Sequence, residues 1–140
     1  MKPTAIFLPC VALVAITAIV WIKLFIDRLR EMRARNIEPQ LLATRREAGD
    51  RLAHTGAADN LANLFELPVL FYVLCIALAA SNLINAGFVY AAWAYVALRA
   101  VHSFIHCTYN QVTHRFAAYA LSSVILFVMW AAFGVRLASL

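Results

Sequence analysis

Four long stretches of almost uninterrupted apolar side chains constrain this chain more than any other feature. The first, "TAIFLPCVALVAITAIVWIKLFI", covers residues 4–26, and the others cover about 60–80, 87–110 and 116–136. Each is about as long as the ~20 residues that a helix needs to cross a bilayer. A membrane-spanning segment must satisfy its own backbone hydrogen bonds, so each stretch is expected to be a helix.

The composition agrees with a membrane protein. Of the 140 residues, 64% are hydrophobic and only 14% are charged, which leaves too little polar surface to cover a soluble core. Residues 1–140 are expected to form one domain, since so short a chain rarely holds two. One long and two short connections between the spans predict an all-α, antiparallel four-helix bundle.

Most of the charges lie in one connection, residues 27–59. Seven of the 12 Lys and Arg residues and six of the seven acidic residues fall there, so the net charge of +5 does not form a basic stripe for nucleic acid. The first part of this connection, "DRLREMRAR", is expected to continue the first helix. By the positive-inside rule the connection is cytoplasmic and both termini lie outside, as in a bacterial inner membrane.

A polar seam runs along the third span. At 100° per residue, Arg99, His102, His106 and Tyr109 share one helical face, and the opposite face is apolar. An arginine in the bilayer centre costs at least about 2.5 kcal/mol, so this face is expected to turn into the bundle.

Partners for the seam are available on the neighbouring spans. Asn63 and Glu66 lie on the second span, and Arg115 and Tyr119 lie one turn apart at the start of the fourth. Glu66 is the only acidic residue outside the charged connection, so Arg99 is its expected counter-ion. These positions predict a polar cavity that opens toward the cytoplasmic leaflet.

Other uses of these residues are less favoured. Interhelical polar pairs can act only as structural glue. Haem is disfavoured because His102 and His106 point the same way from one helix, and no metal site is expected. The single cysteines, Cys10, Cys75 and Cys107, are expected to be small core residues.

Two segments, "NLFELP" and "RAVHSFIHCTYNQVTHRFAAY", resemble the membrane-associated eicosanoid and glutathione metabolism (MAPEG) family. That family includes microsomal glutathione transferases and prostaglandin E synthase. The resemblance extends over essentially the whole chain. Its specific part is an Asn-x-x-Glu-x-Pro pattern and an Arg-x-x-His pattern with a later Arg and Tyr: Asn63, Glu66 and Pro68, then Arg99, His102, Arg115 and Tyr119.

The resemblance implies a homotrimer that binds glutathione as co-substrate between neighbouring protomers. It implies that Asn63 and Glu66 hold the amino end of the tripeptide. The remaining members of the implied site are Arg99, His102, His106 and Tyr109 as lining residues, and Arg115 and Tyr119 as catalytic residues. Arg115 would favour the glutathione thiolate, because an adjacent guanidinium lowers the pKa of a thiol.

The pattern also departs from the family. No arginine stands just before Asn63, where family members carry one that helps to bind glutathione. Arg30, Arg33 or Arg51 of a neighbouring protomer could replace it, and the sequence does not choose among them.

Three functions follow as hypotheses. The first is a membrane glutathione-dependent transferase or peroxidase that acts on hydrophobic electrophiles or lipid hydroperoxides entering from the bilayer. The alternative is a non-catalytic scaffold of the same fold that binds membrane lipid. A third is a proton or ion relay built on Glu66 and the histidines.

Overall fold

A computed structural model describes residues 3–53 and 55–139. Every regular secondary-structure element in this part of the chain is a helix. Four helical spans are long and apolar enough to cross a membrane: Thr4–Arg35, Gly56–Ala80, Ala86–Cys107 and Val112–Ala138. The all-α fold is therefore confirmed. The elements in order are η1 (Pro3–Ile6), α1 (Phe7–Arg35), η2 (Pro39–Leu42), α2 (Arg45–Arg51), α3 (Gly56–Leu64), α4 (Leu67–Ala80), α5 (Ala86–Cys107) and α6 (Val112–Ala138).

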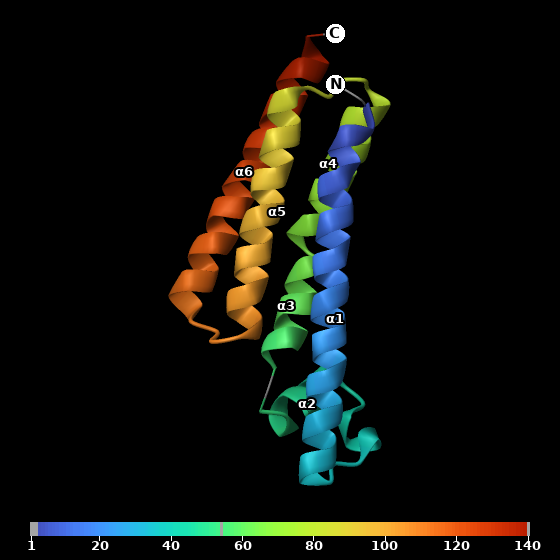
Figure 1. Ribbon diagram of the computed structural model, residues 1–140, viewed down its shortest axis with the longest axis vertical. Helices are drawn as coiled ribbons and strands as arrows, with labels where there is room; N and C mark the ends of the chain where they lie inside the picture. The colour runs from blue at the N-terminus through green and yellow to red at the C-terminus, as the bar shows by residue number, and fades with distance from the viewer. Residues whose placement is uncertain (1–2, 54, 140) are drawn as a thin grey trace.

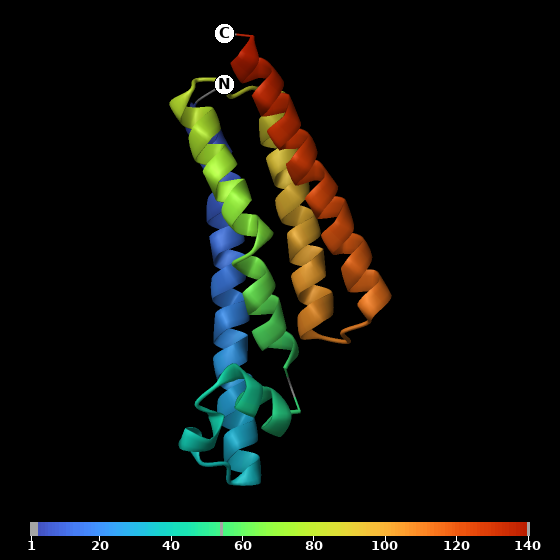
Figure 2. The ribbon, with the colours of Figure 1, turned by 180° about the vertical axis from the view of Figure 1, so that it is seen from behind.

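The four spans run up and down in sequence (Figure 1). α1 lies beside the α3–α4 span, and α5 and α6 form a hairpin that packs against this pair. Both termini lie at one end of the bundle, and the charged connection and the α5–α6 turn lie toward the other, as the view from behind also shows (Figure 2). We call these the terminal end and the loop end.

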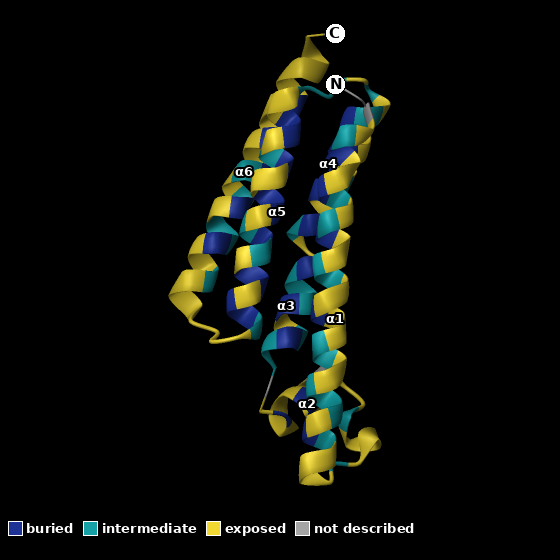
Figure 3. Ribbon diagram, viewed as in Figure 1, coloured by how far each residue is buried: buried dark blue, intermediate teal, exposed yellow. Residues whose placement is uncertain are grey.

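The bundle has an apolar core, and many large apolar side chains lie on its surface. Figure 3 shows how buried and exposed residues are distributed along the helices. Phe71, Leu74 and Leu126 in the core are fully buried. On the outside, Ile19 and Phe104 are each 65% exposed. Large exposed apolar faces on every span are typical of helices that contact lipid, since lipid chains replace water as the solvent there.

The second span is interrupted. α3 ends at Leu64 and α4 begins at Leu67, although the hydrophobic pattern predicts one continuous helix. The physical reason is Pro68, near the start of α4. Its ring has no amide hydrogen to donate and would collide with the carbonyl of Leu64, four residues earlier.

The turn between α5 and α6 lies earlier than the sequence predicts. α5 ends at Cys107 rather than near 110, and α6 already begins at Val112. Asn110 adopts the left-handed conformation, with φ of 48°, which asparagine tolerates better than most residues. Consequently Tyr109 lies in the turn, and Arg115 lies in the first turns of α6.

The charged connection is folded. α1 continues to Arg35, as the charge pattern predicts, and α2 then starts with a capping box in which Thr44 and Glu47 bond each other's backbone amides. Glu31 of α1 is buried and accepts a 2.6 Å hydrogen bond from the amide of Ala53. The connection is thereby fastened to the extended end of α1.

Candidate functional site

Buried polar side chains gather in the loop-end half of the bundle. They come from α3, α5 and α6, as the sequence predicts for the polar seam and its partners. The buried members on these helices are Asn60, Arg99, His102, Ser103, His106 and Ser122.

Arg115 has its side chain against the end of α5. Its Nη1 lies 3.0 Å from Nε2 of His106 and donates a 2.8 Å hydrogen bond to Oδ1 of Asn110. Because a guanidinium has only donors, the ring nitrogen of His106 is the acceptor. Arg115 is half-buried, so one side of a permanent cation stays accessible beside a buried histidine.

His102 joins α5 to the backbone of α6. Its Nδ1 donates to the carbonyl oxygen of Arg115 at 2.9 Å. Its ring lies 5.5 Å from the ring of His106 and 5.7 Å from that of Tyr119. Nε2 of His102 is buried and has no partner among the described residues. His102 thus fixes the backbone from which the Arg115 side chain extends.

Arg99 is fully buried, one turn before His102. Its Nη2 donates a 2.8 Å hydrogen bond to the carbonyl of Asn63, and its guanidinium lies 5.5 Å from the centre of the Tyr119 ring. The expected ion pair with Glu66 is not formed. The guanidinium uses the backbone of the interrupted span instead, and this places Arg99 between α3 and α6.

Glu66 and Tyr109 lie outside this cluster. Glu66, just before α4, is exposed, and its carboxylate forms no ion pair or hydrogen bond with another described residue. Tyr109 is 57% exposed, and its hydroxyl lies 3.4 Å from Nδ1 of His114. The structure therefore leaves these two predicted residues at the surface and brings the other six together. The six are Asn63, Arg99, His102, His106, Arg115 and Tyr119.

A neighbouring contact was not predicted as part of the site. Asn60 is fully buried, accepts from Ser103 at 3.3 Å and donates to Sγ of Cys107 at 3.4 Å. A Cβ on Gly56 would lie 2.6 Å from the carbonyl oxygen of His106, so only glycine lets α3 approach α5 so closely here. The run of small residues between polar ones in "HTGAADN" was the available signal.

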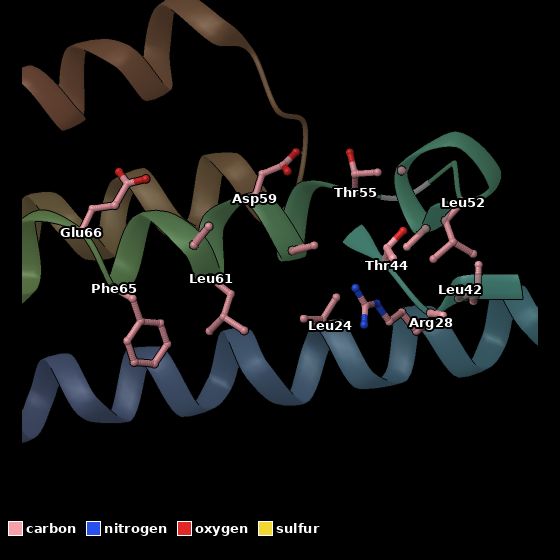
Figure 4. A pocket seen from close by; sticks show the side chains of 15 residues that line it. Leu24, Arg28, Leu42, Thr44, Leu52, Thr55, Asp59, Leu61, Phe65 and Glu66 are labelled. Atoms are coloured by element: carbon pink, nitrogen blue, oxygen red, sulfur yellow. The ribbon is translucent and has the colours of Figure 1, made fainter. Parts of the chain in front are cut away.

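A cavity of about 650 Å³ lies between α1, α3 and the folded connection (Figure 4). Its lining residues include Asp59, Glu66, Thr55 and Arg28. Nε of Arg28 is buried without a partner among the described residues. The sequence predicts a cavity among the second, third and fourth spans instead. Of the predicted site residues, only Glu66 lines the cavity between α1 and α3.

No group of three or more His, Cys, Asp and Glu side chains within residues 3–53 and 55–139 is placed to hold a metal ion. The cluster itself contains two arginines, two histidines, an asparagine and a tyrosine. Such a set can bind and orient an anionic or zwitterionic molecule through charge-assisted hydrogen bonds.

Comparisons with known proteins assign the family. No match is found among curated proteins, and none among solved structures. The family model described as "MAPEG family" matches residues 6–135 of the 140. That match includes every residue of the cluster and all but the outermost few residues of the first and last spans, so the chain belongs to the MAPEG family.

Proposed function

We propose that this protein is a membrane glutathione-dependent transferase or peroxidase that acts on hydrophobic electrophiles or lipid hydroperoxides. The observation that carries the proposal is the half-buried guanidinium of Arg115, held beside His106 by a 3.0 Å contact. A guanidinium cannot lose its charge under physiological conditions. It is therefore suited to stabilise a thiolate, the reactive form of glutathione.

In this proposal Arg115 and Tyr119 act on the sulfur, and Asn63 and Glu66 bind the amino end of the tripeptide. His106 and Tyr109 line the same region, and Arg99 and His102 lie behind them. The exposed Glu66 carboxylate supports this assignment, because a carboxylate on a membrane span is costly unless a cation lies against it.

We further propose that the site is completed in a homotrimer, with glutathione between protomers. The surface position of Glu66 and Tyr109 supports an interface there. Arg28 is the arginine that lines a cavity together with Glu66, whereas Arg30, Arg33 and Arg51 do not line it. Arg28 is therefore our candidate for the cation that binds a glutathione carboxylate.

A glutathione titration of the detergent-solubilised trimer tests the proposal. Thiolate absorbance and thermal stability are measured with glutathione up to millimolar concentrations, on the wild type and on Arg115→Ala. We expect the wild type to gain both signals and Arg115→Ala to lose the thiolate signal. Arg136→Ala, an exposed arginine at the terminal end, is the matched control and should behave as the wild type.

Two outcomes contradict the proposal. In the first, the wild type shows neither signal at millimolar glutathione, which excludes glutathione use. Alternatively Arg115→Ala retains the full thiolate signal, which excludes the role of Arg115. Circular dichroism and size-exclusion chromatography establish that the variant stays folded and assembled.

One observation favours the alternative of a lipid-binding scaffold. An apolar groove of about 300 Å³ runs between α1 and α5, lined by Ile16, Val20 and Phe104, with Lys23 among its lining residues. An acyl chain with an anionic head would match it, although Lys23 already pairs with Asp27 at 2.7 Å. Co-purification of fatty acid without any glutathione response would support the scaffold.

The protein is an integral membrane protein. We propose a bacterial inner membrane, with the charged connection in the cytoplasm and both termini outside. The structure supports one part of this orientation, because the connection and the turn before Arg115 lie toward the same end. Cytosolic glutathione would then reach the loop end directly.

A further inference from the structure

The interruption of the second span leaves a backbone carbonyl that a continuous helix would have satisfied. In an unbroken helix the Asn63 carbonyl would accept from the amide of Leu67. Instead, Phe65 and Glu66 separate the two helices, and the dihedral angles of Glu66 (φ −95°, ψ −105°) are not helical. Inside a membrane bundle such a carbonyl needs another donor, since lipid offers none.

Arg99 supplies that donor. Its Nη2 lies 2.8 Å from the Asn63 carbonyl oxygen, although the two residues are 36 positions apart. The contact resembles the capping of a helix end by a basic side chain, except that here the cap comes from another helix. No carboxylate contacts this fully buried guanidinium among the described residues, so its bond to the carbonyl is its principal interaction.

The same guanidinium reaches α6. It lies 5.5 Å from the ring centre of Tyr119, and Tyr119 lies one turn after Arg115. A planar guanidinium can bond in its plane and stack on its face at the same time, which the ammonium of lysine cannot do. Arg99 therefore contacts both the backbone that carries Asn63 and Glu66 and the helix that carries Arg115.

We propose that Arg99 is a positioning residue that caps the broken end of α3 and so fixes Asn63 and Glu66 relative to α6. Its full burial separates it from any molecule bound at the surface of the protomer. The structural part of this inference stands by itself, and its effect on ligand binding rests on the proposed function.

Hydrogen–deuterium exchange of the intact protein in detergent tests the structural part. The variants are Arg99→Met, which keeps the length of the side chain, and Arg99→Lys, which keeps its charge. We expect exchange of the backbone amides in residues 63–69 to rise at least about fivefold in Arg99→Met, with a smaller rise in Arg99→Lys. Exchange in the second half of α4 should stay as in the wild type.

Arg136→Met is the matched control. Arg136 also lies over an aromatic ring, at 5.8 Å from the centre of Phe88, but it caps no carbonyl among the described residues. It should leave exchange in residues 63–69 unchanged. If Arg99→Met cannot be obtained folded, Arg99→Lys decides the test. Unchanged exchange in residues 63–69 in the folded Arg99 variants overturns the inference.

Glutathione binding separates positioning from direct contact. Because Arg115 is intact in these variants, we expect the half-saturating glutathione concentration to rise by about tenfold while the thiolate signal at saturation stays the same. Loss of the signal at saturation would make Arg99 a direct contact and overturn its positioning role. If the wild type does not respond to glutathione, the proposed function fails, and the exchange experiment still decides whether Arg99 caps α3.

Discussion

The terminal-end and loop-end halves of the bundle are built on different principles. The terminal half is held by close-packed apolar side chains such as Phe71, Leu78 and Leu126, which are fully buried. The loop half buries polar groups such as Arg99 and His106 and joins its helices through particular hydrogen bonds. Lipid is as apolar as leucine, so packing in the terminal half gains from shape and dispersion rather than from escape from water.

This difference teaches where stability and function lie. Apolar contacts in the terminal half can be exchanged for others of the same volume with little loss. The polar contacts of the loop half have fixed partners. Four of the six buried polar atoms that lack a partner among the described residues also lie there, including Nε2 of His102, and each lowers the stability. A region that retains such costs is where a ligand site is expected.

The largest effect is expected in the terminal half. Phe71 is fully buried and stacks on Tyr95 with ring centres 4.6 Å apart. Phe71→Ala should lower the free energy of unfolding by about 3–5 kcal/mol, because it leaves a cavity in a packed core. Phe127→Ala is the control, because Phe127 on α6 is 54% exposed. In a thermal unfolding experiment this variant should lose much less stability. Equal losses would show that the terminal half is not held by packing.

A smaller effect is expected where the connection meets α1. Glu31 pairs with Arg35 at 3.0 Å and accepts from the amide of Ala53. Glu31→Ala should reduce the free energy of local opening in the connection by about 1.5–3 kcal/mol, measured by hydrogen exchange over residues 39–53. Glu38→Ala, at an exposed position, should leave that exchange unchanged. An equal response of both variants would mean that the connection folds without α1.

The close approach of α3 to α5 gives the next prediction. In Gly56→Ala the new methyl group meets the carbonyl of His106, so the helices must separate and stability should fall by about 1–3 kcal/mol. Gly134→Ala, on α6 with nothing within 4 Å of its Cβ position, should be neutral or slightly stabilising. The two thermal unfolding midpoints are compared in the same detergent. A stable Gly56→Ala variant would show that the loop half tolerates repacking as the terminal half does.

The smallest effect is expected at the start of α2. Thr44→Ala removes the hydroxyl that accepts from the amide of Glu47 and should cost about 1 kcal/mol of local stability. Hydrogen exchange in α2 should rise, and the unfolding midpoint of the spans should not change. Thr113→Ala, exposed near the start of α6, serves as control. A lower midpoint of the spans in Thr44→Ala would mean that α2 supports the bundle.

The number of spans and their antiparallel order could be predicted from the sequence. Each span is recognised from its own run of about 20 apolar residues, and consecutive spans must cross the membrane in opposite directions. The interruption at Glu66 was missed because the apolar pattern continues on both sides of it. Pro68 was the signal that could have revealed the interruption. The early end of α5 depends on the left-handed conformation of Asn110, and a hydropathy pattern carries no information about backbone conformation.

The face that carries the site was also predictable, because helical periodicity places Arg99, His102 and His106 together. Asn63, Arg115 and Tyr119 also lie beside this face, as predicted, but the bonding partner of Arg99 was not predictable. Arg99 bonds a backbone carbonyl, which no side-chain pattern reveals, and the predicted partner Glu66 remains at the surface. The contact between Gly56 and His106 depends on how two helices cross, which is a property of the assembled bundle.

α1 is longer than the hydrocarbon layer of a membrane is thick. Its 29 residues extend about 44 Å at 1.5 Å per residue, against a hydrocarbon layer of about 30 Å. The helix therefore extends beyond the hydrocarbon layer, and its loop-end part carries the η2–α2 segment and one wall of the cavity that Arg28 lines. Water-soluble molecules can thus meet a folded part of the protein outside the hydrocarbon layer before anything enters the membrane interior.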